Sequence, residues 1–127
     1  MATKFNGHFD LIGEGPPILC IPGFGNSNWV FNKLVKGQSR QFTFVLPDNR
    51  GMGRSPAAMQ PYFMQDLAQD CINLMDDLGH EKFSVIGLSM GGFIAQLLTL
   101  MVPNRVNSLA LLCSTSSGED FKKYFHL

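Results

Sequence analysis

One short segment of the sequence has the residue types and the spacing to activate a serine. Residues 87–91 read Gly-Leu-Ser-Met-Gly and match the pattern Gly-x-Ser-x-Gly. The apolar run Phe83–Ile86 precedes them and the apolar run Met90–Met101 follows, which predicts a tight turn from a strand into a helix. Such a turn is too crowded for side chains two residues before and after the serine, and Gly87 and Gly91 meet that requirement.

We expect this turn to present the hydroxyl of Ser89 as a nucleophile at the amino end of a helix. The backbone N–H of Met90 and the positive end of the helix dipole would stabilise a developing oxyanion there. Gly92 would let the helix pack closely on the sheet. The alternative is a serine that merely turns the chain.

A second oxyanion donor is expected from the loop Pro22-Gly23-Phe24-Gly25, which breaks an apolar strand. Glycines on each side of Phe24 would let its backbone N–H point inward while its side chain lines a pocket. The alternative is a glycine-rich loop that merely changes the direction of the chain.

Around these segments, strand patterns alternate with helix patterns. Strands are predicted at Lys4–Asn6, His8–Ile12, Ile18–Ile21, Phe42–Leu46, Phe83–Ile86 and Val106–Cys113. Helices are predicted from Asn26 or Ser27 onwards, over Met64–Leu78 and over Met90–Met101. Gly79 would end the second helix as a left-handed cap. The alternation predicts an α/β fold, a mostly parallel sheet with flanking helices, in one domain over residues 1–127.

The composition excludes some partners. The 127 residues have a formal net charge of zero, with 45% hydrophobic and 16% charged residues. Nucleic acids and membrane surfaces attract clustered charge, so neither is expected as a partner. The N-terminus lacks the apolar core of a signal peptide. Three separated cysteines, Cys20, Cys71 and Cys113, are expected as reduced thiols packed in the core of a cytoplasmic protein, without a metal.

Four ordered blocks resemble the α/β-hydrolase superfamily, above all carboxylesterases, 3-oxoadipate enol-lactonases and cofactor-free haloperoxidases. The blocks are residues 15–25, 48–55, 87–92 and 103–106, which read GPPILCIPGFG, DNRGMGRS, GLSMGG and PNRV. The resemblance spans almost the whole chain. Such relatives usually carry His-Gly where this chain has Pro22-Gly23.

The resemblance assigns roles to residues at matching positions. Ser89 would be the nucleophile, and the backbone N–H groups of Phe24 and Met90 would form the oxyanion hole. Gly23, Phe24 and Trp29 would line the substrate pocket. The Asp48–Ser55 loop would brace the site through polar contacts of Asp48 and Arg50. That loop also superficially resembles a phosphate-binding loop, but it lacks the third glycine and the lysine.

The implied activity is hydrolysis of a small carboxylic ester or lactone, without a cofactor, through an acyl-enzyme on Ser89. A serine at this position disfavours haloalkane dehalogenases, which attack through a carboxylate. A cofactor-free haloperoxidase or a C–C bond hydrolase of the same superfamily is an alternative.

The acid and the histidine of a catalytic triad are not found at the family's positions. The chain carries His8 and His80, which we expect on the far side or rim of the sheet, and His126 beside its end. Glu119 and Asp120 follow the last predicted strand, where some α/β-hydrolases place the acid, but a solvated turn is the expectation because no histidine is there for them to orient. His126 as a substitute base is the alternative to an absent base. The fold is therefore expected to be truncated after about its sixth strand, and this chain alone is expected to be inactive or weak.

The final strand would then be an exposed apolar edge. Val106–Cys113 has no predicted neighbour on one side, and such an edge invites pairing with another chain. We expect self-association or a complementing C-terminal fragment there. A non-catalytic remnant or assembly module is thus the alternative to the enzyme.

Overall fold

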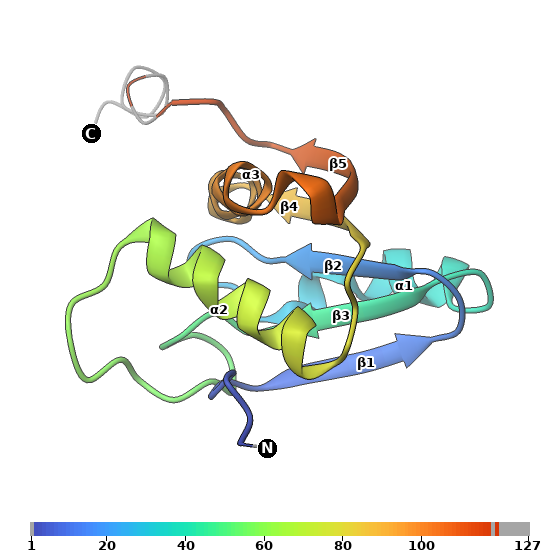
Figure 1. Ribbon diagram of the computed structural model, residues 1–127, viewed down its shortest axis with the longest axis horizontal. Helices are drawn as coiled ribbons and strands as arrows, with labels where there is room; N and C mark the ends of the chain where they lie inside the picture. Colours follow the sequence, from blue (N-terminus) through green and yellow to red (C-terminus); the bar gives the residue numbers. More distant parts are fainter. Residues whose placement is uncertain (1, 118, 120–127) are drawn as a thin grey trace.

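The fold is built on a five-stranded sheet, four of whose strands are parallel. The computed structural model describes residues 2–117 and 119. The strands are β1 (Phe9–Gly13), β2 (Pro17–Ile21), β3 (Thr43–Pro47), β4 (Phe83–Leu88) and β5 (Val106–Leu112). Their order is β1-β3-β2-β4-β5, with β1 antiparallel to β3 (Figure 1). The parallel pairs require crossover connections, which the helices supply.

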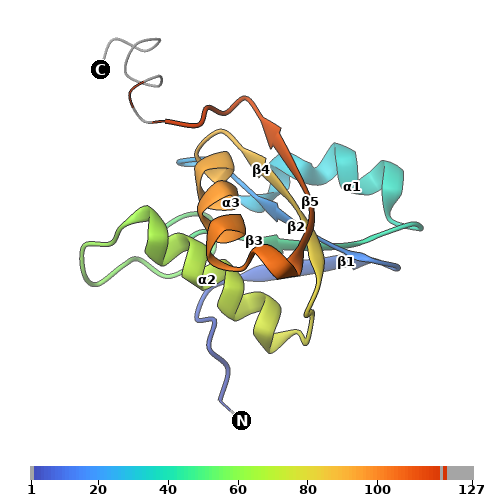
Figure 2. The same cartoon turned by 45° about the horizontal axis from the view of Figure 1, so that its top comes forward.

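Helices cover both faces of this sheet. The short helix η1 (Asn28–Phe31) and α1 (Asn32–Gln38) lie on one face, and α2 (Met64–Asp77) and α3 (Met90–Met101) lie on the other (Figures 1 and 2). A last short helix, η2 (Pro103–Arg105), leads into β5. The α/β architecture with flanking helices is confirmed.

The side chains of the central strands alternate between two cores. In β2, Leu19 and Ile21 pack in the larger core beneath α2 and α3. Cys20, between them, packs with Phe31 and Val35 on the opposite face. A strand covered on both faces needs apolar residues at every position, which explains the uninterrupted apolar run in the sequence.

The boundaries of α2 agree closely with the predicted helix. Its amino end has no serine, threonine, aspartate or asparagine as cap; instead the Phe63 N–H donates to Asp66 Oδ2 at 2.7 Å. At its carboxyl end Gly79 has φ +75°, the left-handed conformation expected there.

The predicted strand at Lys4–Asn6 is wrong, so the sheet has five described strands and not six. The backbone N–H groups of Lys4 and Phe5 donate to the carboxylate of Asp77 at 2.8–3.0 Å. This segment is therefore held by the carboxyl end of α2 and does not join the sheet.

The helix after the glycine-rich loop begins where it is predicted, with Ser27 at the cap position, but the capping hydrogen bond differs from the expectation. Ser27 occupies the cap position of η1 but its side chain makes no capping hydrogen bond. The N–H of Asn28 instead donates to Asp48 Oδ1 at 2.7 Å. A carboxylate distant in sequence thus caps this helix.

The three cysteines divide into two buried and one exposed thiol. Burial raises the pKa of both Cys20 and Cys71 to about 12, so both are protonated at neutral pH. Cys113 is exposed, because β5 forms the outer edge of the sheet. The expectation that every cysteine packs in the core is wrong for Cys113.

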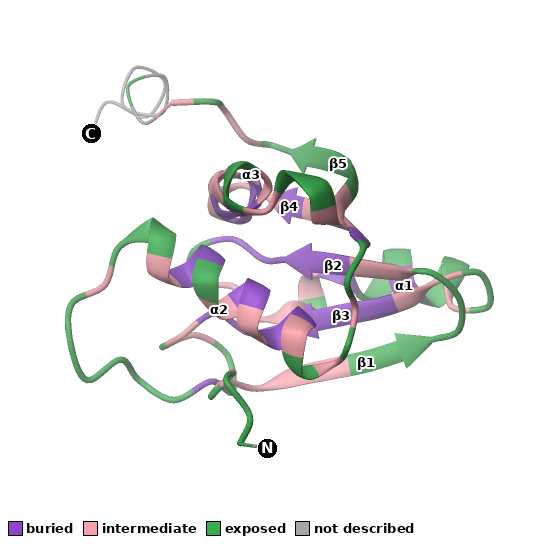
Figure 3. Cartoon of the chain, viewed as in Figure 1, coloured by how far each residue is buried: buried purple, intermediate pink, exposed green. Residues whose placement is uncertain are grey.

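The edge strand β5 is exposed along most of its length (Figure 3). It pairs with β4 alone, in parallel, so one row of its backbone groups has no strand beside it in the described structure. None of the described helices is long and apolar enough to cross a membrane.

Candidate active site

Ser89 lies between the last residue of β4 and the first residue of α3 with an unusual backbone conformation. Its φ is +54° and its ψ is −118°. A residue other than glycine held in such a sparsely populated region costs on the order of 1–3 kcal/mol, which the surroundings must offset. Strain of this kind is found at functional sites more than elsewhere.

Three hydrogen bonds hold this strained turn. The N–H of Ser89 donates to the carbonyl of Leu112 at 2.8 Å, which ties the turn to the end of β5. The Ser89 carbonyl accepts the N–H of Gly92 at 2.8 Å and the hydroxyl of Ser114 at 2.9 Å. The conformation of Ser89 therefore depends on β5 and on the residues that follow it.

The glycines around Ser89 are sterically required. A Cβ on Gly87 would lie 2.4 Å from the carbonyl oxygen of Gly91. A Cβ on Gly91 would lie 2.0 Å from the carbonyl oxygen of Ile21 at the end of β2. A Cβ on Gly92 would lie 2.3 Å from Ser114 Oγ, so α3 approaches the segment after β5 closely at this point.

The loop after β2 runs beside the Ser89 turn. A Cβ on Gly23 would lie 3.2 Å from the Leu88 carbonyl and 3.3 Å from Ser89 Cβ. The side chain of Asn49, buried at the start of the loop after β3, donates to the Pro22 carbonyl at 3.1 Å. Asn49 thus orients the Pro22–Gly23 peptide group. The next peptide group, Gly23–Phe24, carries the Phe24 N–H.

Phe24 and Met90, whose N–H groups are the expected oxyanion donors, both line one hollow of about 340 Å³. Phe24 is 77% exposed, whereas Met90 is half-buried. Trp29 lies in η1, is 63% exposed and is not among the residues that line this hollow. The structure therefore brings Phe24 and Met90 together and leaves Trp29 outside.

Asp48 organises the loop that follows β3. Its side chain is buried and accepts the N–H of Asn28 at 2.7 Å and the N–H of Arg54 at 3.0 Å. Gly53, at φ +55°, leaves the space that this carboxylate occupies. Asp48 thereby joins the loop to the start of η1.

Arg50 extends from the same loop to α2. Its guanidinium binds the carboxylate of Asp70 with two hydrogen bonds of 2.8 Å and lies 5.4 Å from the centre of the Tyr62 ring. The hydrogen bond with Asp70 raises the pKa of Arg50 above its ordinary value. Asp48 and Arg50 both make the polar contacts expected of a bracing loop.

A comparison with known protein families identifies the family to which this strand-turn-helix arrangement belongs. The family model for the alpha/beta hydrolase fold matches residues 16–125. The chain belongs to this family.

Individual relatives agree with the assignment to the α/β-hydrolases. Over 114 residues the chain is 34% identical to a dihydrolipoyllysine-residue acetyltransferase component of an acetoin cleaving system from Pseudomonas putida, covering 87% of this chain and 30% of that protein. It is 28% identical to a putative carbamate hydrolase from Azorhizobium caulinodans, covering 90% and 43%. The structure of a thermophilic esterase from Thermogutta terrifontis is similar with a TM-score of 0.83 and 28% identity, covering 91% and 44%. The chain thus spans less than half the length of each of these proteins.

The described histidines of this α/β-hydrolase chain lie away from Ser89. His80 precedes β4, so the six residues of that strand, about 20 Å at 3.3 Å per residue, separate it from the turn. His8 precedes β1, three strands from β4, and its Nε2 lies 3.3 Å from Asp10 Oδ2. Within residues 2–117 and 119, no hydrogen bond joins Ser89 Oγ to an imidazole.

The remaining candidates lie near the end of the chain. Glu119 is exposed, in agreement with a solvated position. Asp120 and His126 fall outside the described residues. No group of three or more histidine, cysteine or acidic side chains within the described part could hold a metal ion.

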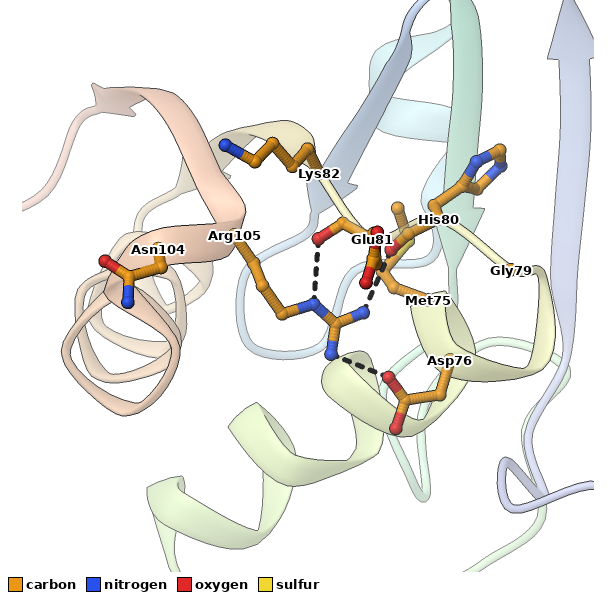
Figure 4. Close-up of a pocket in the computed structure, with 8 residues that line it drawn as sticks. All are labelled: Met75, Asp76, Gly79, His80, Glu81, Lys82, Asn104 and Arg105. Atoms are coloured by element: carbon orange, nitrogen blue, oxygen red, sulfur yellow. Dashed lines mark hydrogen bonds and ion pairs between the residues drawn. The ribbon is translucent and has the colours of Figure 1, made fainter.

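His80 belongs instead to a hollow of about 530 Å³ at the amino ends of β4 and β5 (Figure 4). Arg105 fills this region: its guanidinium donates to the carbonyls of His80 and Glu81, each at 2.9 Å, and to the carboxylate of Asp76 at 2.6 Å. These bonds connect the end of α2 to the start of β5. Each of the three guanidinium nitrogens of Arg105 donates one hydrogen bond to the protein.

Two residues near the α/β-hydrolase turn had no role in the sequence analysis. Asn49 contacts the loop after β2, and Ser114 contacts Ser89. Both act through side chains that reach a backbone carbonyl more than 20 residues away, so no local pattern marks them. Ser114 directly follows a predicted strand and Asn49 lies three residues after another, so both are expected near the carboxyl edge of the parallel sheet, where functional sites lie.

Proposed function

We propose that Ser89 is the nucleophile of a serine hydrolase that acts on a small carboxylic ester or lactone through an acyl-enzyme. The observation that carries the proposal is the strained backbone of Ser89 between β4 and α3, in a turn that admits only glycine at positions 87 and 91. A conformation this costly is retained where it exposes a reacting group.

In this mechanism Ser89 Oγ attacks the carbonyl carbon of the substrate while a base takes the hydroxyl proton. The backbone N–H groups of Met90 and Phe24 stabilise the oxyanion, supported by the positive end of α3. The base then gives its proton to the departing oxygen, which leaves as the free alcohol of an ester or stays attached as the hydroxyl of an opened lactone. Water, deprotonated by the same base, hydrolyses the acyl-enzyme and releases the acid and Ser89.

We do not assign the base to His8 or His80, because His80 precedes β4, at the opposite end of that strand from Ser89, and His8 precedes β1, three strands away. We therefore expect the 127-residue chain alone to turn over esters weakly. In serine proteases, an oxyanion hole and substrate binding without the triad still leave about 10³–10⁴-fold over water. Weak turnover is thus compatible with a missing base.

Labelling with a fluorophosphonate probe tests the nucleophile. We expect one label per chain, on Ser89, formed slowly by the chain alone because no described imidazole deprotonates the hydroxyl. Ser89→Ala should lose the label completely, as measured by intact-protein mass spectrometry. Ser84→Ala, a matched change within β4 whose hydroxyl bonds Ser108 at 2.8 Å, should label like the native chain. Equal labelling of Ser89→Ala, or no labelling of the native chain, would contradict the proposal.

A second candidate function, assembly, is favoured by the edge strand β5. Its sequence, Val-Asn-Ser-Leu-Ala-Leu-Leu, contains no charge and no proline, the residues with which edge strands commonly prevent pairing. Leu109, Leu111 and Leu112 are each at least one-third exposed. We propose that β5 pairs with a second copy of the chain or with a complementing fragment.

Sedimentation of the chain at micromolar concentration tests the assembly. We expect a species larger than the 14.1 kDa monomer, and Ala110→Lys, which adds a charge at the middle of the exposed edge, should weaken association by about tenfold or more. Met59→Lys, at a residue 91% exposed in the loop before α2, is the control and should leave association unchanged. A monodisperse native monomer would rule out self-association.

A further inference from the structure

The hollow beside Ser89 has a uniform chemical character. Its lining residues come from the loop after β2, the segment between β3 and α2, α2 itself and the start of α3: Phe24, Met52, Tyr62, Phe63, Met64, Leu67 and Met90. Every side chain in this lining is aliphatic, thioether or aromatic, with the hydroxyl of Tyr62 as the single polar group among them. Its volume of about 340 Å³ lies at the lower end of the range of about 300–1,000 Å³ typical of small-molecule sites.

The hollow is placed to receive part of a substrate that reacts at Ser89. Phe24 and Met90, two of its lining residues, are the residues whose N–H groups would hold the oxyanion. When the N–H groups of Phe24 and Met90 bind the carbonyl oxygen of a substrate, the group attached to that carbonyl lies beside the side chains of Phe24 and Met90. The lining therefore decides which substituent is accepted.

The cations of the neighbouring loop are not part of the lining of the hollow. Arg50 is bound by both carboxylate oxygens of Asp70, and the Tyr62 ring lies against its guanidinium. Arg54 is tied to the same loop through its backbone N–H, which donates to Asp48 Oδ2 at 3.0 Å. Neither arginine lines the hollow.

The negative charges near the hollow disfavour an anion further. Asp66 lies in the first turn of α2 and bonds the N–H of Phe63, so the positive end of α2 is already occupied by a carboxylate. The remaining positive feature at the hollow is the amino end of α3, which faces the reacting carbonyl in the proposed mechanism. A second anionic group held against this apolar lining would lose part of its hydration and gain no cationic partner, which is unfavourable.

We propose that this hollow binds a neutral apolar group, an alkyl chain or an aromatic ring, next to the reacting carbonyl, and rejects a group that ends in a carboxylate. The inference rests on the proposed function for its catalytic meaning. It separates two substrate classes: neutral carboxylic esters are accepted, and lactones or esters that carry a free carboxylate are not.

Binding of two unreactive ketones tests the inference without any chemical step. Methyl pentyl ketone is neutral, and the matched keto acid replaces its terminal methyl group by a carboxylate. With the methionine methyl groups labelled with carbon-13, NMR reports on Met52, Met64 and Met90 in the lining and on Met59 outside it. We expect the ketone to shift the three lining signals saturably and to bind about tenfold or more tightly than the keto acid, with Met59 unaffected.

A charge placed in the lining should reverse this preference. Met52 is half-buried in the lining, and Met52→Lys should strengthen binding of the keto acid by about tenfold, since the new ammonium group pairs with the carboxylate. The matched control Met59→Lys introduces the same charge outside the lining and should leave both affinities unchanged. The inference is overturned if the native chain binds the keto acid as tightly as the ketone, or if neither ligand shifts the lining signals.

The two proposals fail in different ways. Loss of the fluorophosphonate label with the ketone still bound would refute the nucleophile and leave the apolar hollow. Labelling at Ser89 with no preference for the neutral ketone would refute the hollow and leave the nucleophile.

Discussion

Gly91→Ala should destabilise the fold by about 3 kcal/mol or more, because the added methyl group has no space. Its Cβ would lie 2.0 Å from the carbonyl oxygen of Ile21 and 2.8 Å from that of Pro22, and both are backbone atoms that cannot rotate away. Either α3 must move off the sheet or the end of β2 must shift. Urea unfolding followed by circular dichroism measures the loss.

Gly37→Ala is the matched control for this prediction. Gly37 lies in α1 with nothing within 4 Å of an added Cβ. Since alanine has the higher helix propensity, the variant should be as stable as the native chain or more stable by up to about 1 kcal/mol. A Gly91→Ala chain that unfolds at the same urea concentration as Gly37→Ala would show that the turn is looser than the structure indicates.

Asp48→Ala should lower the free energy of unfolding by about 2–4 kcal/mol. The substitution removes the acceptor of two backbone N–H groups, those of Asn28 and Arg54, at a side chain that is 1% exposed. The start of η1 and the loop after β3 would then lose their common attachment. Thermal and urea unfolding measure the change.

Asp48→Asn serves as the graded comparison. The amide keeps the volume and one acceptor oxygen but turns an N–H toward one of the two donors, so a loss of about 1–2 kcal/mol is expected. If Asp48→Ala and Asp48→Asn both remained within about 0.5 kcal/mol of the native chain, the carboxylate would not organise the loop.

Local patterns predicted those parts of the fold that depend on neighbours in sequence. The apolar stripe of Met64–Asp77 and the left-handed Gly79 define α2 almost to the residue. The central strands were recognisable because burial on both faces demands continuous apolar runs. The same applies to the Ser89 turn, where glycine spacing follows from the sterics of the turn itself.

Features that depend on distant partners were not predictable in this way. The segment around Lys4 is polar and short and could pass for a strand, but its N–H groups bind Asp77, 73 residues away. Ser27 is a favourable cap by residue type, yet Asp48 takes over that role from 20 residues away. Cys113 has the pattern of a core residue, and its exposure follows from the position of β5 in the sheet order.

In the candidate site, too, the residues that depend on local sequence were predictable and those that depend on distant partners were not. The residue types and spacing of the turn identified Ser89, Gly87, Gly91 and Gly92, while Asn49 and Ser114 emerged only from the three-dimensional structure. Trp29 was assigned to the pocket by resemblance, and the hollow is lined instead by the segment Tyr62–Met64 and by Met52. Which side chains converge on a cavity depends on how loops fold over the sheet, and sequence spacing does not specify that.

The hydrogen bond from the Ser89 N–H to the Leu112 carbonyl gives this amide proton a particular meaning. Its exchange with solvent deuterium requires the turn to separate from the end of β5, so its protection factor measures how often the edge strand opens at that point. The exchange rate of this one backbone proton at Ser89 therefore measures how stably the edge strand β5 is held in the sheet.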